Sequence, residues 1–233
     1  MIIDCTSDLH GNFPNLPGGD MLIMAGDYTA NDSLKGWHQF FDWLDKQNYK
    51  KKVLVAGNHD NFCKKWAQSD DSIFDVLAGN PTFSYLCDSG IEIDGLKIWG
   101  SPWTLWFEGI NPHCKAFTGS ESDLEKKFDQ IPDEIDILIT HSPPYGIMDR
   151  VKKRNESGIW DPKVNGYHHV GSKSLVDKVS RMQTPPKLWV WGHIHEGYGK
   201  DMAISRGKPC IMVNASHVNE DYNPVNKYIR IEL

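Results

Sequence analysis

The sequence lacks any long apolar run and any surplus of positive charge. No apolar stretch approaches the roughly 18 residues that a membrane-spanning helix requires, so we expect no membrane partner. The formal net charge of −6 argues against a surface dedicated to duplex nucleic acid. The first motif is reached by Asp8, and we therefore expect no signal or transit peptide before it.

Cysteines are few, and no two are spaced as C-x-x-C. This spacing argues against a zinc ribbon or a dithiol redox motif. An odd number of widely spaced cysteines is typical of reduced thiols, and it predicts a cytoplasmic location. The cysteines are Cys5, Cys63, Cys87, Cys114 and Cys210.

The pattern of apolar runs predicts one α/β domain spanning residues 1–233. We find no internal repeat and no low-complexity linker. The expected strands are 1–6, 21–25, 52–56, 83–87, 135–140, 187–191, 210–213 and 227–232. Residues 91–99 are expected to form a hairpin around Asp94-Gly95, a favoured two-residue turn. The expected helices are 32–47, 61–78 with a break, 120–130 (with a capping box from Ser120 and Asp123) and 172–182.

Five short polar motifs each follow an apolar, strand-like run. Ligands of open α/β sheets gather at the carboxyl ends of strands, so these motifs are expected to meet. Asp8 and His10, like His193 and His195, are two residues apart, and in an extended chain such side chains share a direction. The motifs are Asp8-Leu9-His10, Gly26-Asp27, Gly57-Asn58-His59-Asp60, His141 and Gly192-His193-Ile194-His195.

Together the motifs supply carboxylates, an amide oxygen and imidazoles, which are the ligands of a site for two divalent cations. We predict Asp8, His10, Asp27, Asn58, His141, His193 and His195 as metal ligands. Asp27 has two oxygens and is expected to bridge the cations. His59 is expected to stay unligated and to protonate the departing alkoxide.

This ligand set predicts metal-assisted hydrolysis of a phosphoester. A water bridging two metals is acidified toward neutrality and can attack phosphorus in line. Two dications, two carboxylates and one hydroxide leave a charge of about +1, which suits an anionic substrate. Mixed imidazole and carboxylate ligands suit Mn, Fe, Zn, Co or Ni, of which we favour Mn.

The motifs resemble those of the calcineurin-like metallophosphoesterases, whose pattern is D-x-H, G-D, G-N-H-D/E, H and G-H-x-H. The resemblance implies a four-layer α/β/β/α sandwich of two mixed sheets. It also implies one metal on Asp8, His10, Asp27 and His195, a second on Asp27, Asn58, His141 and His193, and catalysis by His59.

A narrower resemblance covers nearly the whole chain. Segments 100–104, 140–146, 193–199 and 214–216 are similar to the metallophosphoesterase-domain-containing group. Resemblance to that group implies phosphodiesterase activity on small substrates, including cyclic nucleotides. A phosphomonoesterase or a nuclease on the same metals, or a scaffold without catalysis, remain alternatives.

Three further residues are candidates for contact with the substrate. Trp103 is placed either to stack on a nucleobase or to pack at a sheet edge. His168 and His169 lie in a long irregular stretch, 141–171, and either touch the phosphate or are exposed without a role.

Overall fold

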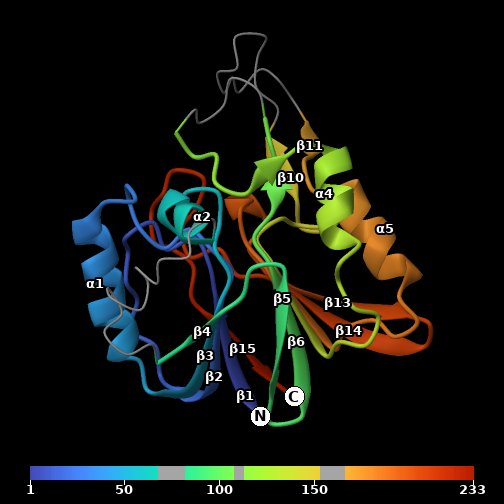
Figure 1. The fold of residues 1–233 in the computed structure, drawn as a ribbon, viewed down its shortest axis with the longest axis horizontal. Coiled ribbons are helices and arrows are strands. Elements are labelled where there is room, and N and C mark those ends of the chain that lie inside the picture. Colours follow the sequence, from blue (N-terminus) through green and yellow to red (C-terminus); the bar gives the residue numbers. More distant parts are fainter. Residues whose placement is uncertain (68–81, 108–112, 153–165) are drawn as a thin grey trace.

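Two β-sheets face each other at the centre of the computed structural model, and helices flank them on both outer sides (Figure 1). The structure describes residues 1–67, 82–107, 113–152 and 166–233. The amino and carboxyl termini lie side by side at the lower end of the view, because the first and last strands pair.

The first sheet is parallel except at one edge. Across the sheet its strands are β15 (Ile229–Glu232), β1 (Ile2–Thr6), β2 (Gly19–Met24), β3 (Tyr49–Leu54) and β4 (Ser84–Tyr85). Only β15 runs antiparallel to its neighbour. The carboxyl ends of β1, β2 and β3 therefore lie at one end of the molecule.

The second sheet repeats this design with antiparallel strands at both edges. Its order is β13 (Gly199–Ser205), β14 (Lys208–Asn214), β12 (Leu188–Trp191), β9 (Ile137–Thr140), β6 (Leu96–Ser101) and β5 (Ser89–Ile93). The four inner strands are parallel. A β-bridge between Ser7 and Ser216 joins the two sheets just beyond the carboxyl ends of β1 and β14.

Helices cover the outer faces. Figure 1 shows α1 (Leu34–Asp45) beside the first sheet, and α4 (Glu121–Phe128) and α5 (Lys173–Arg181) beside the second. Ser33 caps α1, and Ser120 with Asp123 forms the expected capping box of α4. The shorter elements are α2 (Asn61–Ala67), η1 (His195–Gly197), and the small pairs β7 (Thr104–Leu105) with β8 (Thr118–Gly119) and β10 (Arg150–Lys152) with β11 (Tyr167–His169).

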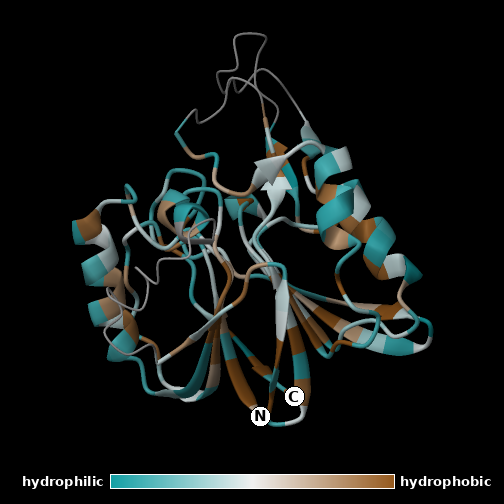
Figure 2. Ribbon diagram, viewed as in Figure 1, coloured by the Kyte–Doolittle hydropathy of each residue, from teal (hydrophilic) through white to brown (hydrophobic). Residues whose placement is uncertain are grey.

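Three buried clusters fill the three interfaces between layers, and Figure 2 shows hydrophobic residues along the strands that supply them. Successive residues of β2 illustrate the rule, because neighbouring side chains of a strand point to opposite faces. Met21 and Ile23 enter the cluster between the sheets, whereas Leu22 and Met24 pack against Trp37 and other α1 residues. The third cluster joins the second sheet to α4 and α5. The four-layer sandwich of two mixed sheets is therefore confirmed.

Most expected elements are present, with ends shifted by a few residues. The hairpin is confirmed, with Asp94 and Gly95 both at positive φ. The expectation for 210–213 was too short: β14 spans Lys208–Asn214 and pairs with β13, which the apolar pattern did not predict. That edge strand contains only three successive apolar residues, Met202-Ala203-Ile204, and its other residues are glycine or polar, so no long apolar run marks it. The distal half of the 61–78 helix, from residue 68, lies outside the described residues.

Candidate metal centre

Each polar motif follows the carboxyl end of a parallel strand, and five strands are involved. Asp8 and His10 follow β1, Asp27 follows β2, and Asn58 and His59 follow β3. From the second sheet, His141 follows β9, and His193 and His195 follow β12. Because both sheets direct these strand ends the same way, residues far apart in sequence meet between them.

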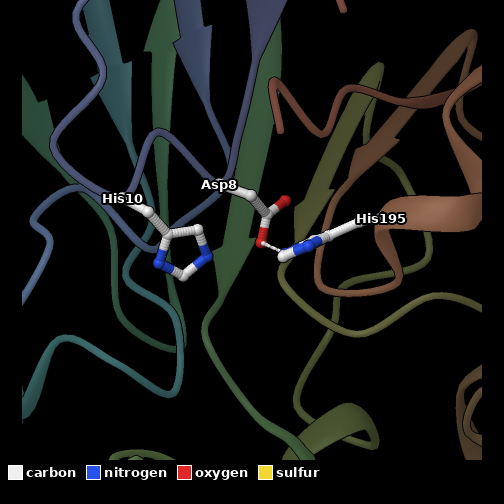
Figure 3. Close-up of side chains that lie close together, drawn as sticks. All are labelled: Asp8, His10 and His195. Atoms are coloured by element: carbon white, nitrogen blue, oxygen red, sulfur yellow. Dashed lines mark ion pairs between the residues drawn. The ribbon is translucent and has the colours of Figure 1, made fainter. Parts of the chain in front are cut away.

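Three overlapping groups of side chains are arranged so that each could hold a cation. They are Asp8, His10 and His195; His10, Asp27 and His59; and Asp8, Asp27 and His141. Within each group the ligand atoms lie within 4.8 Å of one another. Figure 3 shows the first group, with the Asp8 carboxylate pointing at the His195 ring.

Asp27 lies at the centre of the cluster. Its Oδ2 atom is 3.5 Å from His141 Nε2, 3.8 Å from His10 Nε2 and 3.9 Å from His59 Nε2. These three imidazoles come from three different strands. A carboxylate in this position can serve two cations at once.

The remaining two expected ligands lie on the side of His141. The Oδ1 atom of Asn58 is 2.9 Å from His141 Nε2. The ring of His193 is 5.0 Å from that of His141, centroid to centroid, whereas His195 contacts Asp8. His193 and His195 thus join different halves of the cluster, contrary to the expectation that an extended chain gives them a common direction.

The backbone explains why that expectation was wrong. Asp8 has φ of 51°, His10 43°, Asp27 58° and His193 67°, all in the left-handed region. Such values are uncommon for residues other than glycine, although Asp and His adopt them more readily than most. The chain turns sharply at these three motifs instead of continuing extended, and the strain is concentrated where the side chains converge.

Backbone carbonyls fix the tautomer of two histidines. The Nδ1–H of His141 donates to the Ala25 carbonyl at 2.7 Å, and the Nδ1–H of His195 donates to the Asn219 carbonyl at 3.0 Å. A carbonyl can only accept, so the second nitrogen of each ring, Nε2, faces the cluster. Metal-binding histidines are commonly oriented by such outer hydrogen bonds.

The cluster is buried, and its electrostatics favour bound positive charge. Burial raises the pKa of Asp8, but its hydrogen bond with His195 and nearby imidazoles outweigh this and hold it well below the usual range. For His141 burial lowers the pKa, yet the Asp27 carboxylate prevails and raises it to about 9. The two buried carboxylates therefore attract either protons or a cation.

Two other imidazoles are kept neutral, as metal ligation requires. Burial lowers the pKa of His10 to about 4 and that of His193 to about 3. Among the described residues, His10 Nε2 is a buried polar atom without a hydrogen-bond partner. An uncompensated buried nitrogen is costly, and a cation beside Asp27 would satisfy it. The donor set therefore fits divalent metal ions.

Asp60 organises the site without belonging to its ligands. Its buried carboxylate accepts hydrogen bonds from the backbone N–H groups of Asp27 and Gly57, each at 2.8 Å, and Tyr28 at 3.1 Å. These contacts fasten the turn after β2 to the turn after β3. The sequence motif contains Asp60, but sequence reasoning gave it no role.

Other neighbours of the cluster were also missed. Ser216 donates a hydrogen bond to Asp8 Oδ2 at 2.8 Å. The Tyr222 ring lies edge-on against His10 and His195, with centroids 4.8 and 5.3 Å away, and Tyr222 is 44% exposed. It thus forms part of the outer wall of the site. Ser216 lies in segment 214–216, which the narrower resemblance includes, but sequence reasoning gave neither residue a role.

The three expected substrate contacts lie in different surroundings. Trp103 packs edge-on against Phe117 and donates to Asp88, the environment of a packing residue. His169 is 2.5 Å from the buried Asp149 carboxylate. His168 is exposed in the middle of β11, and its side chain lies on the opposite face of the strand from those of Tyr167 and His169. Contact of any of the three with substrate stays a prediction.

Comparison with known proteins identifies the family. The family model for calcineurin-like phosphoesterases matches residues 1–197. Metallophosphoesterase domain-containing protein 1 of Homo sapiens is 34% identical over 98% of this chain and 70% of its own, and the Mus musculus protein gives the same values. The crystal structure of TT1561 of Thermus thermophilus superposes with a TM-score of 0.60, at 12% identity over 98% of this chain and 97% of that one.

The chain belongs to the calcineurin-like phosphoesterase family. As a member it is a metal-dependent phosphoesterase, and the buried cluster is its candidate metal centre. In the described part of this phosphoesterase, no helix is long and apolar enough to cross a membrane. A polar hollow of about 410 Å³ adjoins η1 and is lined by Arg150, Lys152, Tyr167, Glu196 and Glu220.

Proposed function

We propose that this phosphoesterase hydrolyses a small phosphodiester, with cyclic nucleotides as the first class to test, and that it uses two divalent cations. The position of Asp27 is the observation that carries the proposal. Its Oδ2 atom lies within 3.9 Å of imidazoles from both sheets. That placement suits a bridging carboxylate between two metal sites.

The two sites would share Asp27. Asp8, His10 and His195 would complete one, and Asn58, His141 and His193 the other, with Mn favoured. Two such cations, when bound, polarise a phosphoryl group and make water acidic near neutral pH. The buried carboxylates of Asp8 and Asp27 would balance the charge of the cations, and His10 and His193 are neutral and can ligate them.

His59 would act on the leaving group. Its side chain is 18% exposed, compared with 5% for His10 and 0% for His141. Among the imidazoles near Asp27 it is therefore the one that a substrate can reach most easily. A proton at Nε2 can pass to the departing oxygen, which lowers the cost of expelling an alkoxide.

Hydrolysis of two nitrophenyl esters tests the proposal. Protein stripped with chelator is assayed with bis-p-nitrophenyl phosphate and p-nitrophenyl phosphate, with and without Mn. We expect turnover that Mn restores and that favours the diester, which would justify a screen of cyclic nucleotides. Preference for the monoester would overturn the phosphodiesterase proposal in favour of a phosphatase. No hydrolysis of either ester would overturn it in favour of a scaffold without catalysis.

A further inference from the structure

A loop distant in sequence is fastened over the motif that carries His59. The backbone N–H of Ala116 donates to the Asn58 carbonyl at 3.1 Å, and the Asn58 side-chain amide donates to the Cys114 carbonyl at 3.2 Å. The Asn61 amide also donates to the His113 carbonyl, at 3.1 Å. The loop 113–116 is therefore held in a fixed position relative to His59.

This loop brings a thiol to the outer side of the His59 ring. The Sγ atom of Cys114 lies 3.1 Å from His59 Nδ1. The opposite ring nitrogen, Nε2, is 3.9 Å from Asp27 Oδ2. The ring thus spans the distance between the thiol and the metal cluster, with one nitrogen committed to each.

The backbone of His59 is held as well. Its N–H donates to Asp27 Oδ1 at 2.9 Å, so one carboxylate orients both the main chain and the ring side that faces the cluster. The remaining freedom of the side chain is rotation about its own bonds. The Cys114 contact opposes that rotation, because turning the ring over would replace Nδ1 beside the thiol with the Cδ2 carbon.

We propose that Cys114 is a positioning residue that holds the His59 imidazole with its Nε2–H directed at the leaving group. In the imidazolium that delivers the proton, Nδ1–H donates to the Cys114 sulfur. The Nε2 proton passes to the departing oxygen, which leaves a neutral imidazole that keeps its proton on Nδ1. A third group that orients the acting imidazole is a recurrent feature of histidine catalysis. The inference rests on the proposed function, because it assumes that His59 delivers a proton.

Leaving groups of different quality test this role. Proton delivery matters for methyl phenyl phosphate, whose leaving phenolate is poor, and much less for methyl p-nitrophenyl phosphate. With Cys114→Ala we expect kcat to fall about tenfold on the phenyl ester, little change on the nitrophenyl ester, and unchanged KM. Cys114→Ser should recover most of the loss, because a hydroxyl oxygen can also accept a hydrogen bond from Nδ1–H. Cys87→Ala serves as the matched control, since Cys87 packs in the core around α1.

A second measurement does not depend on turnover. Long-range ¹H–¹⁵N spectra of the chelator-treated protein should show the neutral His59 ring protonated at Nδ1, and Cys114→Ala should give a mixture of tautomers. An unchanged tautomer in Cys114→Ala, or equal loss on both esters, would overturn the role of Cys114. His59→Ala is assayed alongside: if its loss is the same for both esters, the proposed function of His59 fails instead.

Discussion

The Oδ1 atom of Asp27 accepts a hydrogen bond from the backbone N–H of His59 at 2.9 Å, while Oδ2 faces the imidazoles. One carboxylate therefore couples the metal cluster to the backbone of the expected proton donor. The two functions proposed for the site, cation binding and proton delivery, depend on the same carboxylate.

Replacing this carboxylate should remove both cations. In Asp27→Ala, the group that would bridge the metals is absent, and His59 loses its backbone acceptor. We expect less than about one tenth of the wild-type metal after dialysis and loss of the rise in melting temperature that Mn gives the wild type. Metal analysis and thermal unfolding with and without Mn measure both effects. Retention of one cation per chain would show that Asp27 serves a single site.

The His59 side chain should be dispensable for metal binding. Because its Nε2 atom also lies near His10 and Asp27, the geometry alone leaves room for ligation. We expect His59→Ala to retain its metal and to hydrolyse methyl phenyl phosphate, whose leaving group is poor, roughly 10²–10⁴-fold more slowly, the usual contribution of a general acid. Metal content and kcat are measured on the same preparation. A drop in metal content would identify His59 as a ligand.

Asp60 should matter for stability. Asp60→Ala leaves the N–H groups of Asp27, Tyr28 and Gly57 without their acceptor. Each unsatisfied buried donor costs about 1–3 kcal/mol, so we expect the free energy of unfolding to fall by at least about 3 kcal/mol. Urea unfolding of the chelator-treated protein measures it. Asp42→Ala, a change at an exposed residue of α1, provides the control; equal losses in the two variants would contradict the structural role.

The apolar runs predicted an α/β domain, and the resemblance of the motifs implied the sandwich. Neither predicted how the side chains of the motifs converge. Strands that fill a core are visible in the sequence as apolar runs, and a motif such as Gly57-Asn58-His59-Asp60 is rare enough to recognise. The left-handed turns at Asp8 and His193 depend on contacts with distant strands. No local pattern could reveal them.

The residues that support the cluster could not be predicted from the sequence for a similar reason. Cys114 lies in an irregular stretch, and its place beside His59 depends on hydrogen bonds across 55 positions of sequence. Ser216 reaches Asp8 only because the two sheets meet at that end. Such contacts form only in the assembled fold, and the spacing of residues in the sequence does not predict them.

Gly192 should be irreplaceable because of space, not because of its backbone angle. A Cβ atom there would collide with Asp8 Oδ2 and Ser7 Oγ, far closer than real contacts allow. Gly192→Ala must therefore displace the Asp8 carboxylate from His195. We expect weaker metal binding, seen as a Mn concentration for half-maximal activity that is higher by about tenfold or more, with a fold that remains intact by circular dichroism. Gly36→Ala in α1, whose Cβ would approach no atom closer than 3.3 Å, is the matched control. Equal behaviour of the two variants would show that the Asp8 side chain can move without loss.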